Sequence, residues 1–73
     1  MVETITFQLR SEEDFIPLMS LLKATNIVYS GAEAGEVITQ GMVTRNGVVE
    51  LRKRAKIHSG ETVCFDIYEI KVL

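Results

Sequence analysis

The feature that most constrains the fold of this chain is the Asn46-Gly47 pair, which stands between two runs of β-prone residues. Residues 42–45 read Met-Val-Thr-Arg, and residues 48–51 read Val-Val-Glu-Leu. Asn-Gly between two such runs is the strongest short-range signal for a β-hairpin. The sequence therefore predicts an antiparallel hairpin in the second half of the chain.

Two short helices are predicted ahead of this hairpin. The first has apolar residues at i, i+3, i+4 and i+7, which places on one helix face Phe15, Leu18, Met19 and Leu22. Proline is tolerated only in the first turn of a helix, so Pro17 favours Asp14 as the N-cap. The second helix is predicted to begin at a capping box formed by Ser30 and Glu33 and to end at Gly41.

Strand patterns occupy both ends of the chain. Residues 3–10 alternate apolar and polar side chains, which is typical of a strand with one buried face. A turn at Ser59-Gly60 precedes strand material over residues 62–67 and 68–72. The predicted fold class is α+β, with two short helices packed on a small antiparallel sheet and an added N-terminal strand. No linker or repeat interrupts the chain, and we expect residues 1–73 to form a single domain.

The composition argues against several classes of protein. The 73 residues include one Cys and one His. Cys64 has no partner for an intramolecular disulfide, which is typical of a reducing, cytoplasmic compartment. A signal peptide is not expected, because residues 1–10 lack a basic start and a continuous apolar stretch. A membrane span is not expected, because no apolar run approaches about 18 residues. Without clustered metal ligands or a nucleotide-binding or nucleophile motif, we expect no metal, no cofactor and no independent enzymatic activity.

Positive charge is concentrated in one segment of a chain whose net charge is −2. Residues 45–58 carry five Lys or Arg against one Glu, a net charge of +4. Arg52, Arg54 and Lys56 occupy alternate positions, so an extended strand would place them on one face, spaced for successive nucleic-acid phosphates. Lys53 interrupts this alternation and is expected to reach toward the strand edge. A solvated surface is the alternative interpretation of such a run.

Four sequence motifs together resemble the alpha-L RNA-binding motif, the S4-type RNA-binding domain. They are, in order, Ser30–Ala34, Gly41–Gly47, Glu50–Ile57 and Gly60–Val63. The resemblance covers roughly residues 15–67 and is greatest to the small stand-alone bacterial members of the family. It implies two short helices on a small sheet. It also implies that RNA is held by the second helix, the loop before it and the basic hairpin strand.

The resemblance also implies a set of RNA-binding residues. Ser30 and Gly31 would present backbone N–H groups to a phosphate at the start of the second helix. Cations that would contact phosphates or the minor groove of structured RNA are Arg45, Arg52, Lys53, Arg54 and Lys56. Lys23 would extend this patch, or would instead complement the C-terminal dipole of the first helix. Tyr29 would stack on a base, with simple packing in its loop as the alternative.

The second helix departs from the family pattern at Gly35 and Glu36, where the family commonly has basic or long polar residues. Gly35 costs about 1 kcal/mol relative to alanine in a helix interior, and either permits a close backbone approach or has no role. The sequence predicts a non-enzymatic module for ribosomal or transfer RNA, acting as a monomer or weak dimer with a possible ribosomal or protein partner. The alternative is a protein-interaction adaptor that keeps the fold without binding RNA.

Overall fold

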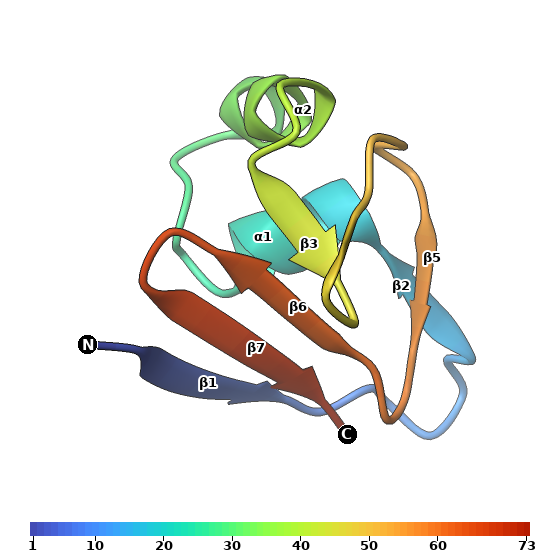
Figure 1. Ribbon diagram of the computed structural model, residues 1–73. Coiled ribbons are helices and arrows are strands. Elements are labelled where there is room, and N and C mark those ends of the chain that lie inside the picture. The colour runs from blue at the N-terminus through green and yellow to red at the C-terminus, as the bar shows by residue number, and fades with distance from the viewer.

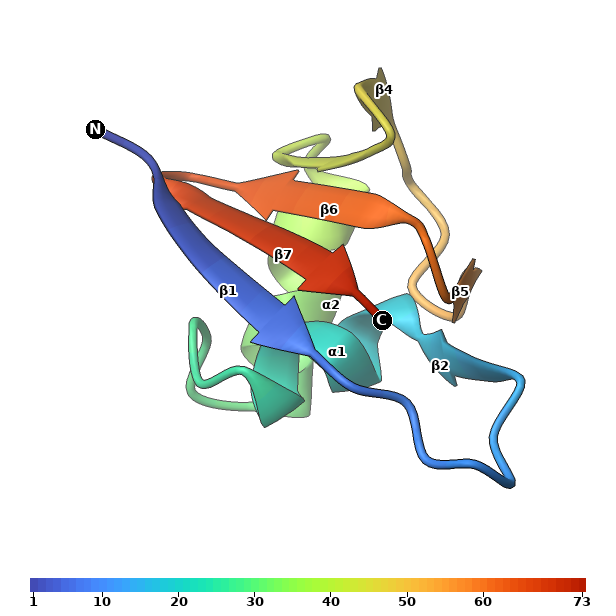
Figure 2. The ribbon, with the colours of Figure 1, turned by 90° about the horizontal axis from the view of Figure 1, so that it is seen from below.

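Both helices lie on one side of a five-stranded sheet in the computed structural model, which describes residues 1–73 (Figures 1 and 2). The sheet has the spatial order β1 (Glu3–Phe7), β7 (Tyr68–Val72), β6 (Thr62–Phe65), β3 (Val43–Arg45) and β4 (Val48–Val49). The remaining elements are α1 (Leu18–Ala24), α2 (Gly31–Thr39) and a two-stranded sheet of β2 (Phe15–Pro17) and β5 (Lys56–His58). The predicted α+β fold with its added N-terminal strand is confirmed. Because β1 pairs with β7 in parallel, the sheet as a whole is mixed.

The predicted hairpin joins β3 to β4. Asn46 and Gly47 have φ angles of 52° and 84°, as the two central residues of a type I′ turn require. Thr44 pairs with Val49, and Arg45 pairs with Val48. The hairpin is confirmed, with only two residues in its second strand.

The second helix also begins and ends where the sequence predicts. Ser30 is the N-cap of α2, and Gly41 follows its C-terminal end with a φ of 78°. The Gly41 N–H donates to the Ile38 carbonyl at 3.0 Å, and the Met42 N–H donates to the Val37 carbonyl at 3.1 Å. These two bonds form a Schellman motif, in which the positive φ favours glycine.

The first helix begins later than predicted. Phe15 belongs to β2 rather than to a helix, and Pro17 is the N-cap of α1, with an extended backbone at φ −60° and ψ 141°. Asp14 is therefore not the cap, and the first turn of α1 has no side-chain cap. The prediction was wrong because β2 pairs with β5, a partner that local spacing does not reveal.

The basic segment is not one continuous strand. β4 ends at Val49 and β5 begins at Lys56, so residues 50–55 form an irregular connection, which we call the basic arch. The chain turns there because the Glu50 carboxylate accepts the Arg52 backbone N–H at 3.1 Å, and the Arg52 carbonyl accepts the Ala55 N–H at 3.2 Å. The predicted strand with three cations on one face is thus wrong, although the cations remain close together.

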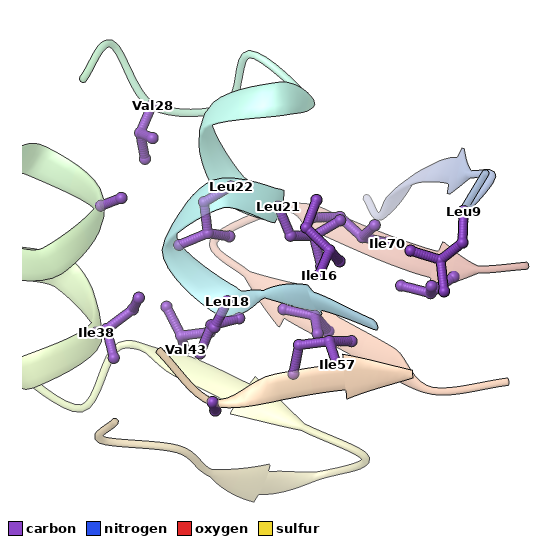
Figure 3. Packing of buried hydrophobic residues seen from close by; sticks show 14 residues of the cluster. Leu9, Ile16, Leu18, Leu21, Leu22, Val28, Ile38, Val43, Ile57 and Ile70 are labelled. Carbon is purple, nitrogen blue, oxygen red and sulfur yellow. The ribbon is translucent and has the colours of Figure 1, made fainter. Parts of the chain in front are cut away.

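The core lies between the helices and the sheet, and α1 is at its centre (Figure 3). Side chains that are fully buried there include Leu18, Leu21, Leu22, Ile38, Val43, Val63 and Ile70. Ile57 of β5 is also fully buried, and Ala55 is nearly so, which anchors the end of the basic arch in this core. Each such leucine or isoleucine contributes roughly 1.5 to 3 kcal/mol. Neither helix is long and apolar enough to cross a bilayer.

Candidate nucleic-acid interface

The start of α2 is built from a capping box. The Ser30 hydroxyl accepts the Glu33 N–H at 3.2 Å, and the Glu33 carboxylate accepts the Tyr29 N–H at 2.6 Å. The reciprocal bond thus goes to the residue before the N-cap. The Gly31 N–H has no partner within the protein, so it remains available at the positive end of the helix dipole.

Replacing Ser30 with alanine is expected to lower the free energy of unfolding by about 1 kcal/mol, because the Glu33 N–H loses its acceptor. Urea unfolding followed by circular dichroism measures this difference. Ser30→Asp is the matched control, because aspartate is an equally good N-cap and should retain the stability of the native protein. Equal losses in both variants would contradict the capping role.

The basic arch runs along α2 from its C-terminal end toward its N-terminal end. Cδ2 of Leu51 lies 3.9 Å from the place where a Cβ on Gly41 would be. Further along the arch, Cδ and Cε of Lys53 lie 3.1 and 3.2 Å from the corresponding place on Gly35, which is buried. Arg54 lines a hollow together with Gly31, at the start of the helix. Gly35 therefore permits the close approach of a lysine side chain, not of another backbone segment. Lys53 itself lies across α2 and not at a strand edge.

Backbone hydrogen bonds tie the arch to the start of α1. The N–H groups of Leu18 and Met19 donate to the carbonyls of Ala55 and Lys53, each at 2.9 Å. These carbonyls satisfy helix N–H groups that otherwise lack acceptors in the first turn. The arch is thereby held in place between both helices.

Two open hollows lie on either side of Arg54. The first has a volume of about 510 Å³ and is lined by Arg45, Arg52, Arg54, Ala55, Lys56 and His58. The second has a volume of about 350 Å³ and is lined by Pro17, Met19, Ser20, Lys23, Gly31 and Arg54. Lys23, Gly31 and Arg54 come from three different elements and meet around this second hollow, which is therefore suited to an anion.

All three nitrogen atoms of the Arg45 guanidinium group have partners within the protein. Its Nε and Nη2 donate to the two carboxylate oxygens of Glu61 at 2.7 and 2.9 Å, and Nη2 also donates to the Lys56 carbonyl at 2.8 Å. Nη1 lies 3.4 Å from Glu50. The hydrogen bonds from Arg45 are the main reason that the pKa of Glu61 falls to about 2. Arg45 thus connects β3, β5 and the arch, and does not present a free charge to solvent.

Arg52 is partly engaged in a similar way. Its Nε and Nη2 donate to the two carboxylate oxygens of Glu50 at 3.1 and 3.2 Å. This bidentate contact is the main cause that lowers the pKa of Glu50 to about 2. The Arg52 side chain is nevertheless exposed, so its remaining amino group still faces solvent. Local spacing in the sequence does not identify Glu50 and Glu61 as partners of these arginines. The one sequence feature that could have suggested this pairing is that both are acidic residues within or next to the basic segment.

Four cations of the predicted site form no ion pair with a carboxylate. These unpaired cations are Lys23, Lys53, Arg54 and Lys56. All four are exposed, and the Nζ atom of Lys56 lies 5.1 Å from the centre of the Phe15 ring. Tyr29, immediately before α2, has a side chain that is 97% exposed and packs on nothing in the core. The surface thus combines uncompensated positive charge with one solvent-facing aromatic ring.

Two helices, of which α2 has a capped N-terminus, pack with the sheet and the arch. Together these elements define a domain of the S4 class. The family model described as S4 domain matches residues 7–73, and the chain belongs to this family. The chain is similar to YbcJ of Escherichia coli (strain K12), with 40% identity over 68 residues that cover 93% of this chain and 96% of that protein. YbcJ of Shigella flexneri gives the same values.

The structure also matches the solution structure of YbcJ from Escherichia coli, which is described as revealing an alpha-L motif involved in RNA binding. The TM-score is 0.74 at 38% sequence identity, and the match covers 100% of this chain and 91% of that chain. The predicted family resemblance is therefore confirmed in both sequence and structure.

Proposed function

We propose that this protein is a non-enzymatic RNA-binding module that recognises structured RNA, of the ribosomal or transfer RNA class, through phosphate and shape contacts. The observation that carries the proposal is the group of unpaired cations gathered around the arch and the start of α2. A mildly acidic protein that leaves these charges uncompensated on one surface favours an anionic partner. Membership of the S4 domain family and the similarity to YbcJ support RNA as that partner.

Within this proposal the contacts divide by position. Ser30 fixes the start of α2. The Gly31 N–H would donate a hydrogen bond to one phosphate, which would lie beside Lys23 and Arg54. Lys56 and the exposed edge of Arg52 would follow the backbone on the other side of Arg54. Lys53 would reach the backbone from across α2, where its side chain lies against Gly35. Arg45 would not contact RNA directly, because its donors are occupied, and would instead hold the arch that carries these cations.

Tyr29 is proposed to stack on a base. Its 97% exposure argues against the alternative of packing within the loop. The bond from its N–H to Glu33 fixes its backbone at the start of α2, close to the proposed phosphate site. A single exposed aromatic residue gives little base discrimination, so recognition would depend mainly on RNA shape and charge.

The same proposal includes a setting for the protein. A single domain that binds RNA by charge would act in the cytoplasm as a monomer or weak dimer, with the ribosome as a possible site of action. No membrane partner is part of this proposal.

Binding to a folded RNA mixture is expected to weaken steeply with salt. Four to five phosphate contacts imply a slope of roughly −3 to −4.5 in a plot of log affinity against log salt. The measurement is fluorescence anisotropy with labelled transfer RNA and a ribosomal RNA fragment over a series of salt concentrations. An absence of binding at low salt, or a slope near zero, would overturn the proposal.

A protein-interaction adaptor is the second candidate function, and one observation favours it. Large apolar side chains are exposed around the free edge strand β4, namely Met42, Val48, Val49 and Leu51. An exposed apolar cluster at a sheet edge is typical of protein contacts. If this candidate is correct, the protein retains a bound protein partner after nuclease treatment and shows no salt-dependent binding to RNA.

A further inference from the structure

We propose that Gly35 is a positioning residue for RNA binding, because it forms the seat on which the Lys53 side chain lies across α2. This inference rests on the proposed function of RNA binding. The place where a Cβ on Gly35 would be lies 3.1 Å from Cδ, 3.2 Å from Cε and 3.6 Å from Nζ of Lys53. A Cβ at residue 35 would therefore press against the lysine stem, and a longer side chain would compete with it for the same space.

The backbone conformation at residue 35 does not require glycine. Gly35 lies inside α2, and its φ is not positive, unlike that of Gly41, Gly47 and Gly60. Glycine is the least favourable residue in a helix interior apart from proline. The contact with Lys53 is the feature of the structure that accounts for glycine at this position.

The seat gives α2 a cation that its own sequence lacks. Residues 31–39 contain Glu33 and Glu36 but no Lys or Arg. The Lys53 carbonyl accepts the Met19 N–H, which fixes the backbone of the arch at this point, and the lysine stem lies against Gly35. Lys53 makes no ion pair, and its ammonium is thus available to a phosphate that approaches the outer face of α2.

The test compares RNA affinity and salt slope for Lys53→Met, Gly35→Gln and the double variant. Methionine keeps an unbranched stem without the charge, and glutamine is a good helix former that fills the seat. Each single variant is expected to weaken binding about five- to eightfold at 0.1 M salt and to reduce the slope by about 0.7 to 0.9, the effect of one lost phosphate contact. The double variant should show the same loss as either single variant, because both remove the same interaction.

Three further measurements make this test specific. Lys53→Arg should keep the native slope, because it retains the charge on a long side chain. Thr39→Gln places the same new residue at the exposed end of α2 and should bind as the native protein does. Gly35→Ala and Gly35→Gln should unfold at higher temperature than the native protein, because they improve helix propensity and displace only a flexible side chain.

The outcomes separate this inference from the proposed function. If the native protein shows no salt-dependent RNA binding, the proposed function fails, and the inference fails with it. If the native protein binds steeply but Lys53→Met keeps the full slope, Lys53 only covers the helix, and the inference alone is overturned. If Lys53→Met weakens binding while Gly35→Gln does not, Lys53 contacts RNA without needing its seat, which also overturns the inference.

Discussion

Replacing the four unpaired cations with alanine is expected to reduce RNA affinity about a thousandfold at 0.1 M salt and to remove most of the salt dependence. Each lost phosphate contact changes the slope by about 0.7 to 0.9, so four contacts account for roughly 2.8 to 3.6. The protein should remain folded, because these side chains are exposed and make no ion pairs. Anisotropy titrations at several salt concentrations measure both quantities.

A variant with the same net charge distinguishes a local site from a general charge effect. Removing the four cations changes the net charge from −2 to −6. Arg10→Glu combined with Lys71→Glu also gives −6, but alters exposed positions outside the hollows. We expect only a small loss of affinity in this control. Equal losses in the two variants would show that RNA responds to total charge and not to the surface around the arch.

Elements whose signals are local were predicted correctly from the sequence. The Asn46-Gly47 turn and the Ser30 cap each depend on residues within four positions of one another. Such features are determined by backbone conformation and by hydrogen bonds between near neighbours. The second helix and the central hairpin were therefore found with nearly their true boundaries.

Elements that depend on distant partners were not predicted. The extended β2 and the late start of α1 follow from bonds between Leu18 or Met19 and carbonyls more than 30 residues later in the chain. No periodicity within residues 15–22 signals those acceptors. The apolar residues have the spacing of a helix face, but Phe15 lies in strand β2, where it pairs with His58.

The candidate site shows the same division. The sequence identified the cations but not their partners, because Glu61 lies 16 positions after Arg45 and meets it only through the pairing of β3 with β6. Two of the predicted arginines are therefore held by carboxylates, whereas the unpaired cations face solvent. The acidic residues thus determine which members of the basic segment hold the fold and which are available to an anion.

Replacing Arg45 with methionine is expected to lower the free energy of unfolding by about 2 to 3 kcal/mol. The substitution leaves the largely buried Glu61 carboxylate without its cation and the Lys56 carbonyl without its donor. In a domain of this size the melting temperature would fall by roughly 10 to 20 °C. Arg52→Met is the matched control, because the Arg52 side chain is 74% exposed, and we expect its stability to stay close to that of the native protein. Urea unfolding of the three proteins at pH 7 measures these differences.

The difference between the native protein and Arg45→Met is also expected to depend on pH. The pKa of Glu61 falls from its usual 4.5 to about 2 mainly through its hydrogen bonds to Arg45. A lowered carboxyl pKa stabilises the fold fully above the unfolded value near 4.5, and this contribution is lost as the pH falls toward 2. The stability difference should thus be constant from pH 5 to 7 and shrink between pH 4.5 and 2. A difference that stays constant down to pH 2 would mean that Arg45 stabilises the fold by packing and not through its charge.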